Sequence, residues 1–256
     1  MDRLKKIDII REKLKDGRPS VGSWIQIPHT SIAEIMGNSG YDWIALDLEH
    51  GSISPHQLPD LFRSLEAGGT LPMARLISAN PDACKQALDA GAGGVILPSI
   101  SSADQLKVAV DSSRWPPAGK RGVGFSRANL FGKNFDIYRS EAQAPLVVAM
   151  LESVSAMNSI EDILEVEGLD AVMIGPYDLS ASLGITGEFL DDRFKNAMDT
   201  IKRACVKAGT PYGLHVVHPS VQELSQRVAE GYQFIAYSID AVFLHESSRI
   251  PDTSPE

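Results

Sequence analysis

The sequence has few of the residue patterns that mark specialised protein classes. Only two of its 256 residues are cysteines, Cys84 and Cys205, and their separation matches no metal-binding spacing, so no disulfide framework or cysteine metal site is indicated. The net charge is −9 and no long basic run occurs, which argues against nucleic acid as a partner. Because so few cysteines suit a reducing compartment, we expect a cytoplasmic protein.

Membrane, targeting and several catalytic motifs are absent as well. No apolar segment is long enough to cross a bilayer, and residues 1–20 have the pattern of a charged helix without the apolar core of a signal peptide. We therefore expect no membrane partner. The phosphate-binding GxGxxG and Walker patterns are missing, as is a nucleophile elbow. No lysine falls inside a predicted strand, so a Schiff-base mechanism is not indicated.

What the sequence contains is a regular alternation of short apolar runs and helical patterns. The apolar runs predict eight strands, at 21–27, 43–48, 71–76, 95–97, 145–151, 171–174, 212–216 and 234–237. Strands alternating with helices predict a (β/α)8 TIM barrel, here with an extra N-terminal helix, a last helix at 241–248 and a polar tail. A doubly wound open sheet is the alternative. Because no linker interrupts the pattern, we expect a single domain over residues 1–256.

The segment 145–184 carries the clearest functional signal. Its two apolar runs, joined by a helical stretch, indicate neighbouring parallel strands. Glu152 follows the first run and Asp178 the second, so both carboxylates should lie at the strand edge where parallel α/β folds bind ligands. Two carboxylates there suit a hard divalent cation. The alternative is that both are acids at helix N-termini, stabilised by the helix dipole.

Two further predicted strands end in ionisable groups. His50 follows the second strand in the stretch DLEHG, where it could act as a general base oriented by a nearby acid. A hydrogen-bonded structural histidine is the alternative. Arg75 closes the third strand, a place that suits binding of a carboxylate or of a developing oxyanion. A salt bridge within the barrel would explain the same arginine.

Other polar or aromatic groups carry weaker patterns. His215 and His218 flank the end of the seventh strand, and we interpret them as site-lining or structural because no third metal ligand clusters with them. Trp24 lies in the first strand as core or pocket wall. The longest irregular stretch, between the fourth and fifth strands, is expected to be functional or disordered. If it is functional, Arg121 and Arg127 could reach an anionic ligand or a neighbouring subunit.

Several motifs together resemble one family. They are DWIALDLEHG, the Ala-Arg pair at 74–75, LDAGAGGVILP, PPAGKRGVG, the LES triplet that contains Glu152, and GPYDLSASLG. In this order and spacing, over nearly the whole chain, they are similar to the class II, metal-dependent pyruvate aldolases. That family includes 4-hydroxy-2-oxo-heptanedioate, 2-dehydro-3-deoxyglucarate and 2-keto-3-deoxy-rhamnonate aldolases. The resemblance implies a TIM barrel, a homohexamer built as a trimer of dimers, and C-terminal helices exchanged between subunits.

The resemblance also implies roles for individual residues. Glu152 and Asp178 would bind Mg²⁺ or Mn²⁺, with Co²⁺ as a further candidate. His50 would be the catalytic base, and Asp89 would be the acid that raises its basicity. Arg75 would stabilise the oxyanion. From the pattern alone, Asp89 would be no more than a polar residue at the end of a helix.

For the substrate, the resemblance implies both contacts and departures. The backbone N–H groups of Tyr177 and Asp178 would hold the pyruvate carboxylate, while Trp24 and the loop around Arg121 would lie near the aldehyde. The family pattern carries Gln where this chain has Met150, and often Ala where it has Tyr177. A thioether cannot replace the hydrogen bonds of an amide, so these two positions bear on the choice of substrate.

The implied reaction is reversible aldol cleavage of a 4-hydroxy-2-oxo acid to pyruvate and an aldehyde, with the pyruvate enolate stabilised by the cation and by Arg75. Three alternatives remain at this stage. One is a related barrel lyase acting on an acyl-CoA or phosphoenolpyruvate-type substrate. Another is an oxaloacetate decarboxylase that forms carbon–carbon bonds, as macrophomate synthase does. The third is a binding protein that keeps the barrel without catalysis.

Overall fold

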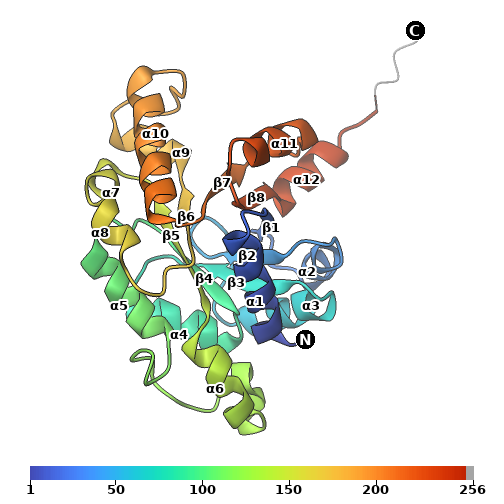
Figure 1. Ribbon diagram of the computed structural model, residues 1–256. Helices are drawn as coiled ribbons and strands as arrows, with labels where there is room; N and C mark the ends of the chain where they lie inside the picture. The colour runs from blue at the N-terminus through green and yellow to red at the C-terminus, as the bar shows by residue number, and fades with distance from the viewer. Residues whose placement is uncertain (252–256) are drawn as a thin grey trace.

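Eight short apolar segments form a closed barrel of parallel strands in the computed structural model, which describes residues 1–251 (Figure 1). The strands follow one another around the barrel in chain order, and β8 pairs with β1. They are β1 (Ser20–Ile25), β2 (Trp43–Asp47), β3 (Leu71–Arg75), β4 (Gly94–Leu97), β5 (Leu146–Leu151), β6 (Ala171–Ile174), β7 (Tyr212–Val216) and β8 (Phe234–Ile239). The predicted TIM barrel is confirmed and the doubly wound sheet is wrong. Residues 252–256 of the predicted polar tail lie outside the described residues.

Helices connect successive strands and surround the barrel. They are α1 (Arg3–Lys15), α2 (Thr30–Gly37), α3 (Leu58–Ala67), α4 (Pro81–Ala90), α5 (Ala103–Ser113), α6 (Phe135–Gln143), α7 (Val154–Asn158), α8 (Ile160–Leu164), α9 (Pro176–Ser182), α10 (Asp192–Ala208), α11 (Val221–Ala229) and α12 (Asp240–Ser247), with a 3₁₀ helix η1 (Arg127–Gly132). Local capping explains several starts: Asn80, Ser102 and Ser220 each accept a hydrogen bond from a backbone amide three residues on. No helix among residues 1–251 is long and apolar enough to span a bilayer.

The barrel interior is filled by every second residue of the strands and is closed at one end by α1. Ile7, Ile10 and Leu14 of α1 pack against this inner cluster. In its middle the rings of Trp43 and Phe234 stack with centroids 4.4 Å apart. The extra N-terminal helix therefore seals the end of the barrel at which the strands begin.

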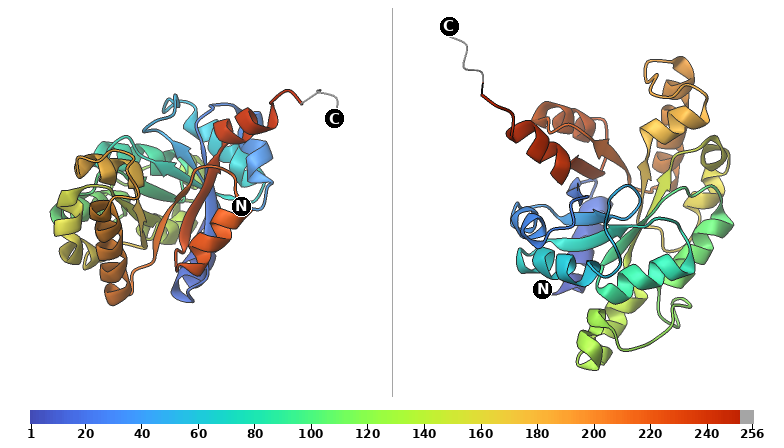
Figure 2. Two further views of the ribbon diagram at one scale, coloured as in Figure 1. Left: turned by 90° about the horizontal axis from the view of Figure 1, so that it is seen from above. Right: turned by 180° about the vertical axis from the view of Figure 1, so that it is seen from behind.

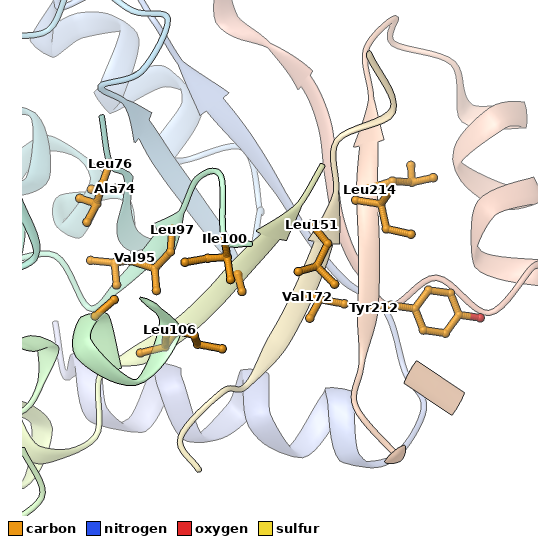
Figure 3. Packing of buried hydrophobic residues seen from close by; sticks show 14 of the residues in the cluster. Ala74, Leu76, Val95, Leu97, Ile100, Leu106, Leu151, Val172, Tyr212 and Leu214 are labelled. Carbon is orange, nitrogen blue, oxygen red and sulfur yellow. The ribbon is translucent and has the colours of Figure 1, made fainter. Parts of the chain in front are cut away.

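A second apolar layer lies between the strands and the surrounding helices. Figure 3 shows part of it, with Val95, Leu97, Leu151 and Val172 on the outer faces of their strands and Leu106 of α5 packed toward them. Because strand side chains alternate in direction, residues of the opposite parity face the barrel axis. This rule places Asp47, Arg75, Met150, Met173, His215 and Ser238 on the inside, each two residues beyond a residue that also points inward.

The stretch between β4 and β5 differs from the expectation. Residues 115–134 were expected to be irregular, but they contain η1. Helix α6, which follows them and precedes β5, was not predicted from the sequence pattern. Arg127 forms an ion pair with Glu66, and Arg121 is buried with its Nη2 donating to the Tyr138 hydroxyl at 3.0 Å. Both arginines therefore hold the outer layer together within this chain.

The last two helices stand to one side of the barrel. Figures 1 and 2 show α11 and α12 beside β7 and β8, and residues of α12 and α2 line a shared small cavity. Helix α11 has no buried residue, although its sequence VQELSQRVA is amphipathic, and Val221 is 74% exposed. Leu224 and Val228 are partly buried against the core, so only the Val221 end of the apolar face is uncovered. A single chain does not display the expected exchange of C-terminal helices.

Candidate active site

A cavity of about 470 Å³ opens at the end of the barrel where the strands finish. The residues that line it include Trp24, Gln26, His50, Arg75, Met150, Met173, Tyr177, Asp178 and His215. These residues come from, or directly follow, six of the eight strands. Most of the residues singled out from the sequence thus face one space, at the edge where TIM barrels carry their active sites.

Arg75 is fixed at the cavity by Asp47 on the neighbouring strand. The two residues are register partners in the β2–β3 pairing. The Nε and Nη2 atoms of Arg75 donate to the two carboxylate oxygens of Asp47 at 2.8 and 2.6 Å. Gln26 donates from Nε2 to the same carboxylate at 2.8 Å. Burial raises the pKa of Asp47, but the hydrogen bonds and charge of Arg75 outweigh burial, so the pKa lies below its usual value.

His50 lies at the rim of the cavity, beside Glu49 rather than Asp89. The Glu49 Oε2 atom is 3.9 Å from His50 Nε2 and 3.6 Å from Arg75 Nε. Burial raises the pKa of Glu49, against the charge of Arg75, which lowers it. Asp89 lies near the C-terminal end of α4 and pairs with Lys85. Because a helix rises about 1.5 Å per residue, Asp89 lies more than one turn away from the cavity end of the barrel.

Glu152 and Asp178 lie close together at the ends of β5 and β6. Glu152 is 7% exposed, and its Oε1 accepts hydrogen bonds from the Ser99 amide at 2.6 Å and the Ser99 hydroxyl at 3.1 Å. Burial raises the pKa of Glu152; the Ser99 hydrogen bond opposes this, and the negative charge of Asp178 adds to it. A side chain on Gly175 would place its Cβ 2.6 Å from Glu152 Oε2, so glycine leaves that oxygen accessible.

This pair suits a divalent cation. Ser99 occupies one oxygen of Glu152, and the other points toward Gly175, in the turn that leads to Asp178. Glu152 is buried, Asp178 beside it is exposed, and the negative charge of Asp178 opposes ionisation of Glu152. A cation would relieve this repulsion, and Mg²⁺ commonly takes one or two carboxylates and completes its shell with substrate and water. No group of three or more His, Cys, Asp or Glu side chains that could hold a metal ion gathers among residues 1–251, at this site or elsewhere, so the two carboxylates would need water and substrate to complete the shell.

The turn into α9 brings backbone amides to the same place. Gly175 precedes the helix and has no side chain to cap it, and Pro176 is the first helical residue. The next N–H groups, of Tyr177 and Asp178, belong to the first turn of α9, where amides have no partner within the helix. The Tyr177 side chain is 59% exposed and its ring meets Phe189 edge-on, with centroids 5.0 Å apart. The bulky Tyr177 side chain therefore lies at the mouth of the cavity.

The opposite wall consists of aromatic groups beside Arg75. The guanidinium carbon of Arg75 is 4.6 Å from the ring centroid of Trp24. The imidazole of His215 meets the same indole edge-on at 5.9 Å. His218, by contrast, is largely exposed and lies 3.2 Å from Glu246 through Nδ1. The two histidines thus have different surroundings. His215 packs against Trp24 in the aromatic wall, whereas His218 is exposed beside Glu246.

Not every residue singled out from the sequence reaches the cavity. Among residues 1–251, those that line the cavity do not include Asp89, Arg121, Arg127 or Glu152, although Glu152 lies beside Asp178 and Arg75, which do. The hypothesis that the two arginines reach an anionic ligand or a neighbouring subunit stays a prediction; within this chain Arg121 bonds to Tyr138 and Arg127 pairs with Glu66. Residues that the sequence pattern did not assign include Gln26 and Ser99. Only strand register, which the sequence does not state, brings them to Asp47 and Glu152.

Comparisons with known proteins agree with this geometry. The family model described as HpcH/HpaI aldolase/citrate lyase matches residues 20–246. The chain is 33% identical to 2-keto-3-deoxy-L-rhamnonate aldolase of Escherichia coli O17:K52:H18, covering 93% of this chain and 89% of that protein. It is 35% identical to 4-hydroxy-2-oxovalerate aldolase of Novosphingobium aromaticivorans, covering 92% and 89% of the two chains.

A solved structure supports the same relationship. The crystal structure of an HpcH/HpaI aldolase/citrate lyase family protein from Burkholderia cenocepacia J2315 superimposes with a TM-score of 0.87 at 31% sequence identity. The superposition covers 94% of this chain and 96% of the other. The similarity therefore extends over the whole barrel.

Proposed function

Because the chain belongs to the HpcH/HpaI aldolase/citrate lyase family, we propose that it catalyses the divalent-cation-dependent, reversible aldol cleavage of a 4-hydroxy-2-oxo acid to pyruvate and an aldehyde. The enzyme is thus a carbon–carbon lyase. The observation that carries the proposal is the arrangement of Arg75 and Asp178, which line the cavity, with Glu152, which lies close enough to both for their charges to act on its pKa. Breaking the bond between C3 and C4 leaves a carbanion, and this arrangement supplies positive charge to hold it as an enolate.

Glu152 and Asp178 would hold the cation, Mg²⁺ or Mn²⁺, with Co²⁺ as a further candidate. When bound, such an ion supplies Lewis-acid stabilisation of charge on the 2-oxo oxygen. The amides of Tyr177 and Asp178 bind the substrate carboxylate at the start of α9.

Arg75 and His50 carry the remaining chemistry. The Asp47 carboxylate holds two nitrogens of Arg75, so the guanidinium is oriented before substrate binds and donates to the developing oxyanion. His50 removes the proton of the C4 hydroxyl group, directly or through water. Glu49 is the acid beside His50 in this chain. The role assigned to Asp89, raising the basicity of His50, requires that Asp89 come from a second copy of the chain.

The substrates are a small oxoacid and an aldehyde, and the side chains that line the cavity and its mouth limit the aldehyde. Met150, 5% exposed, presents a thioether where an amide would hydrogen bond, and Tyr177 narrows the entrance beside Phe189. Trp24 forms the wall behind Arg75. These side chains favour an aldehyde with an apolar portion near the entrance.

The protein acts as a homo-oligomer in the cytoplasm, with a hexamer built as a trimer of dimers as the expected form. Two surfaces support association: the exposed start of α11 at Val221 and an exposed apolar group on and near η1 and α6. That group comprises Val123, Phe125, Leu130, Phe131 and Ile137, each more than half exposed.

The proposal is tested by assaying pyruvate release from a panel of 4-hydroxy-2-oxo acids with metal-stripped protein, before and after addition of Mg²⁺, Mn²⁺ or Co²⁺. Pyruvate should appear only when a cation is present. Activity that needs coenzyme A or a phosphate group, or oxaloacetate decarboxylation without any aldol cleavage, would contradict it. Binding of pyruvate without turnover would leave only a binding role.

A further inference from the structure

The buried wall of the cavity contains an imidazole that the aldol chemistry does not use. His215 faces the barrel axis from β7 and lines the cavity. Its ring lies against Trp24, and Trp24 in turn lies under the guanidinium of Arg75. His215 is therefore next to the group that holds the substrate oxyanion, at the closed side of the cavity and not at its entrance.

The hydrogen bonding of His215 fixes which ring nitrogen can meet a ligand. Nε2 lies 3.3 Å from the carbonyl oxygen of Ser238 on β8. A carbonyl oxygen can only accept, so Nε2 carries the hydrogen and Nδ1 keeps a lone pair. Nδ1 has no hydrogen-bond partner among the described residues. Burial lowers the pKa of His215 to about 4, with the Ser238 hydrogen bond opposing this, so the ring stays neutral near pH 7.

The surroundings decide what kind of group Nδ1 can bind. A neutral acceptor needs a donor, which excludes a carboxylate or a phosphate dianion. Arg75 is close enough for its charge to oppose protonation of His215, so a cationic ligand is disfavoured as well. The remaining donor that small oxoacids and aldehydes carry is a hydroxyl group. A methyl group at the same place would leave Nδ1 without a partner.

Building on the proposed function, we propose that Nδ1 of His215 accepts a hydrogen bond from a hydroxyl group of the substrate and so makes the enzyme prefer hydroxylated substrates to alkyl ones. The hydroxyl group can belong to the oxoacid or to the aldehyde. Pairs of similar size separate the two sources. 3-Hydroxypyruvate and 2-oxobutyrate differ by a hydroxyl against a methyl group in the oxoacid, and glycolaldehyde and propanal differ in the same way in the aldehyde.

The experiment measures, for each pair, the ratio of kcat/KM for the hydroxyl compound to that for the methyl compound, with Mn²⁺ present. His215→Leu removes the acceptor at similar size, whereas the amide oxygen of His215→Asn can take the place of Nδ1. For one of the two pairs, the ratio of kcat/KM should be about tenfold lower in His215→Leu than in the wild type. In His215→Asn the ratio should recover in part. His56→Leu, at an exposed histidine in the loop before α3, should leave both ratios unchanged.

Wild-type ratios near one in both pairs, or ratios that His215→Leu does not change, would overturn the role of His215. Calorimetric binding of the two oxoacids, and of the two aldehydes, to the wild type and both variants provides the same comparison without turnover. If no oxoacid reacts at all, the proposed function fails, while these affinities still decide the inference. Circular dichroism of both variants identifies any that does not fold, and either folded variant is sufficient for the test.

Discussion

At the scale of single residues, the site depends on how Arg75 is held. Its sequence position was consistent both with an oxyanion-binding group and with a salt bridge inside the barrel. The structure shows the salt bridge to Asp47, and the same contact leaves Arg75 lining the cavity. The ion pair with Asp47 thus orients the Arg75 guanidinium and still leaves it at the cavity.

Arg75→Ala should reduce turnover by roughly 10²-fold or more, because it removes a fixed positive charge from the developing oxyanion. The assay is pyruvate release in the presence of Mn²⁺. Arg63→Ala, which breaks an exposed ion pair with Asp60 on α3, is the matched control and should retain wild-type turnover. An Arg75→Ala protein with normal folding and full turnover would contradict the role of this residue.

Asp47→Asn should lower the free energy of unfolding by about 3 kcal/mol near pH 7, because it removes the carboxylate that holds the nearly buried Arg75 and leaves only the longer contact to Glu49. The pKa of Asp47 is lowered in the fold, so its contribution is complete above the unfolded value of 3.8 and is lost as pH falls through the folded value. The stability difference between the two proteins should therefore shrink below pH 4. Urea unfolding across acidic pH measures it, and a difference that stays constant would rule out this ionic origin.

Some site residues follow from sequence and others do not. Glu152, His50 and Arg75 could be found because an ionisable group directly after an apolar strand is unusual. Gln26, Ser99 and the free nitrogen of His215 depend on which strands become neighbours and in what register.

At the scale of elements, the strands could be predicted because each is short, apolar and buried on both faces. β6 and β7 match their predicted limits, and the others differ by one or two residues at one or both ends. Helix α6 was missed because only Tyr138 and Ala142 of its residues are buried, too few for a visible period. Its preceding loop is held by Arg121 and Arg127, whose partners lie far away in sequence.

Helix α1 provides an element-scale prediction, because it closes the barrel through one face only. Ile10 is 1% exposed inside the inner cluster, whereas its neighbour Ile9 is 37% exposed. Ile10→Ala should lower the free energy of unfolding by about 2–5 kcal/mol, and Ile9→Ala should have a much smaller effect. Chemical denaturation of both variants tests this. Equal losses would mean that α1 does not pack as described.

At the scale of the whole molecule, one chain does not contain everything that the family resemblance implies. Asp89 lies near the end of α4 that points away from His50, and α11 has no buried side chain. Sequence could suggest association, but not which surfaces meet, because that depends on a second chain. Both features are explained if neighbouring copies complete the site and cover α11.

Native mass spectrometry should therefore find an assembly of about six times 27.7 kDa. Charged substitution at exposed apolar positions, Phe125→Asp together with Phe131→Asp, should reduce the assembly because these side chains are expected to be covered in it. Lys107→Asp, on the exposed face of α5, is the control. A monomer that retains full activity would contradict the role of association.

The central claim is that the cavity makes the pyruvate enolate with the help of a cation held by Glu152 and Asp178. The most direct test is to incubate metal-stripped protein with pyruvate in D₂O and to follow the methyl signal by NMR, with and without Mg²⁺ or Mn²⁺. We expect methyl protons to exchange only when a cation is present, and exchange to be lost in Glu152→Gln. Pyruvate that binds without exchange in the wild-type protein, or exchange that is equally fast without a cation, would contradict the claim.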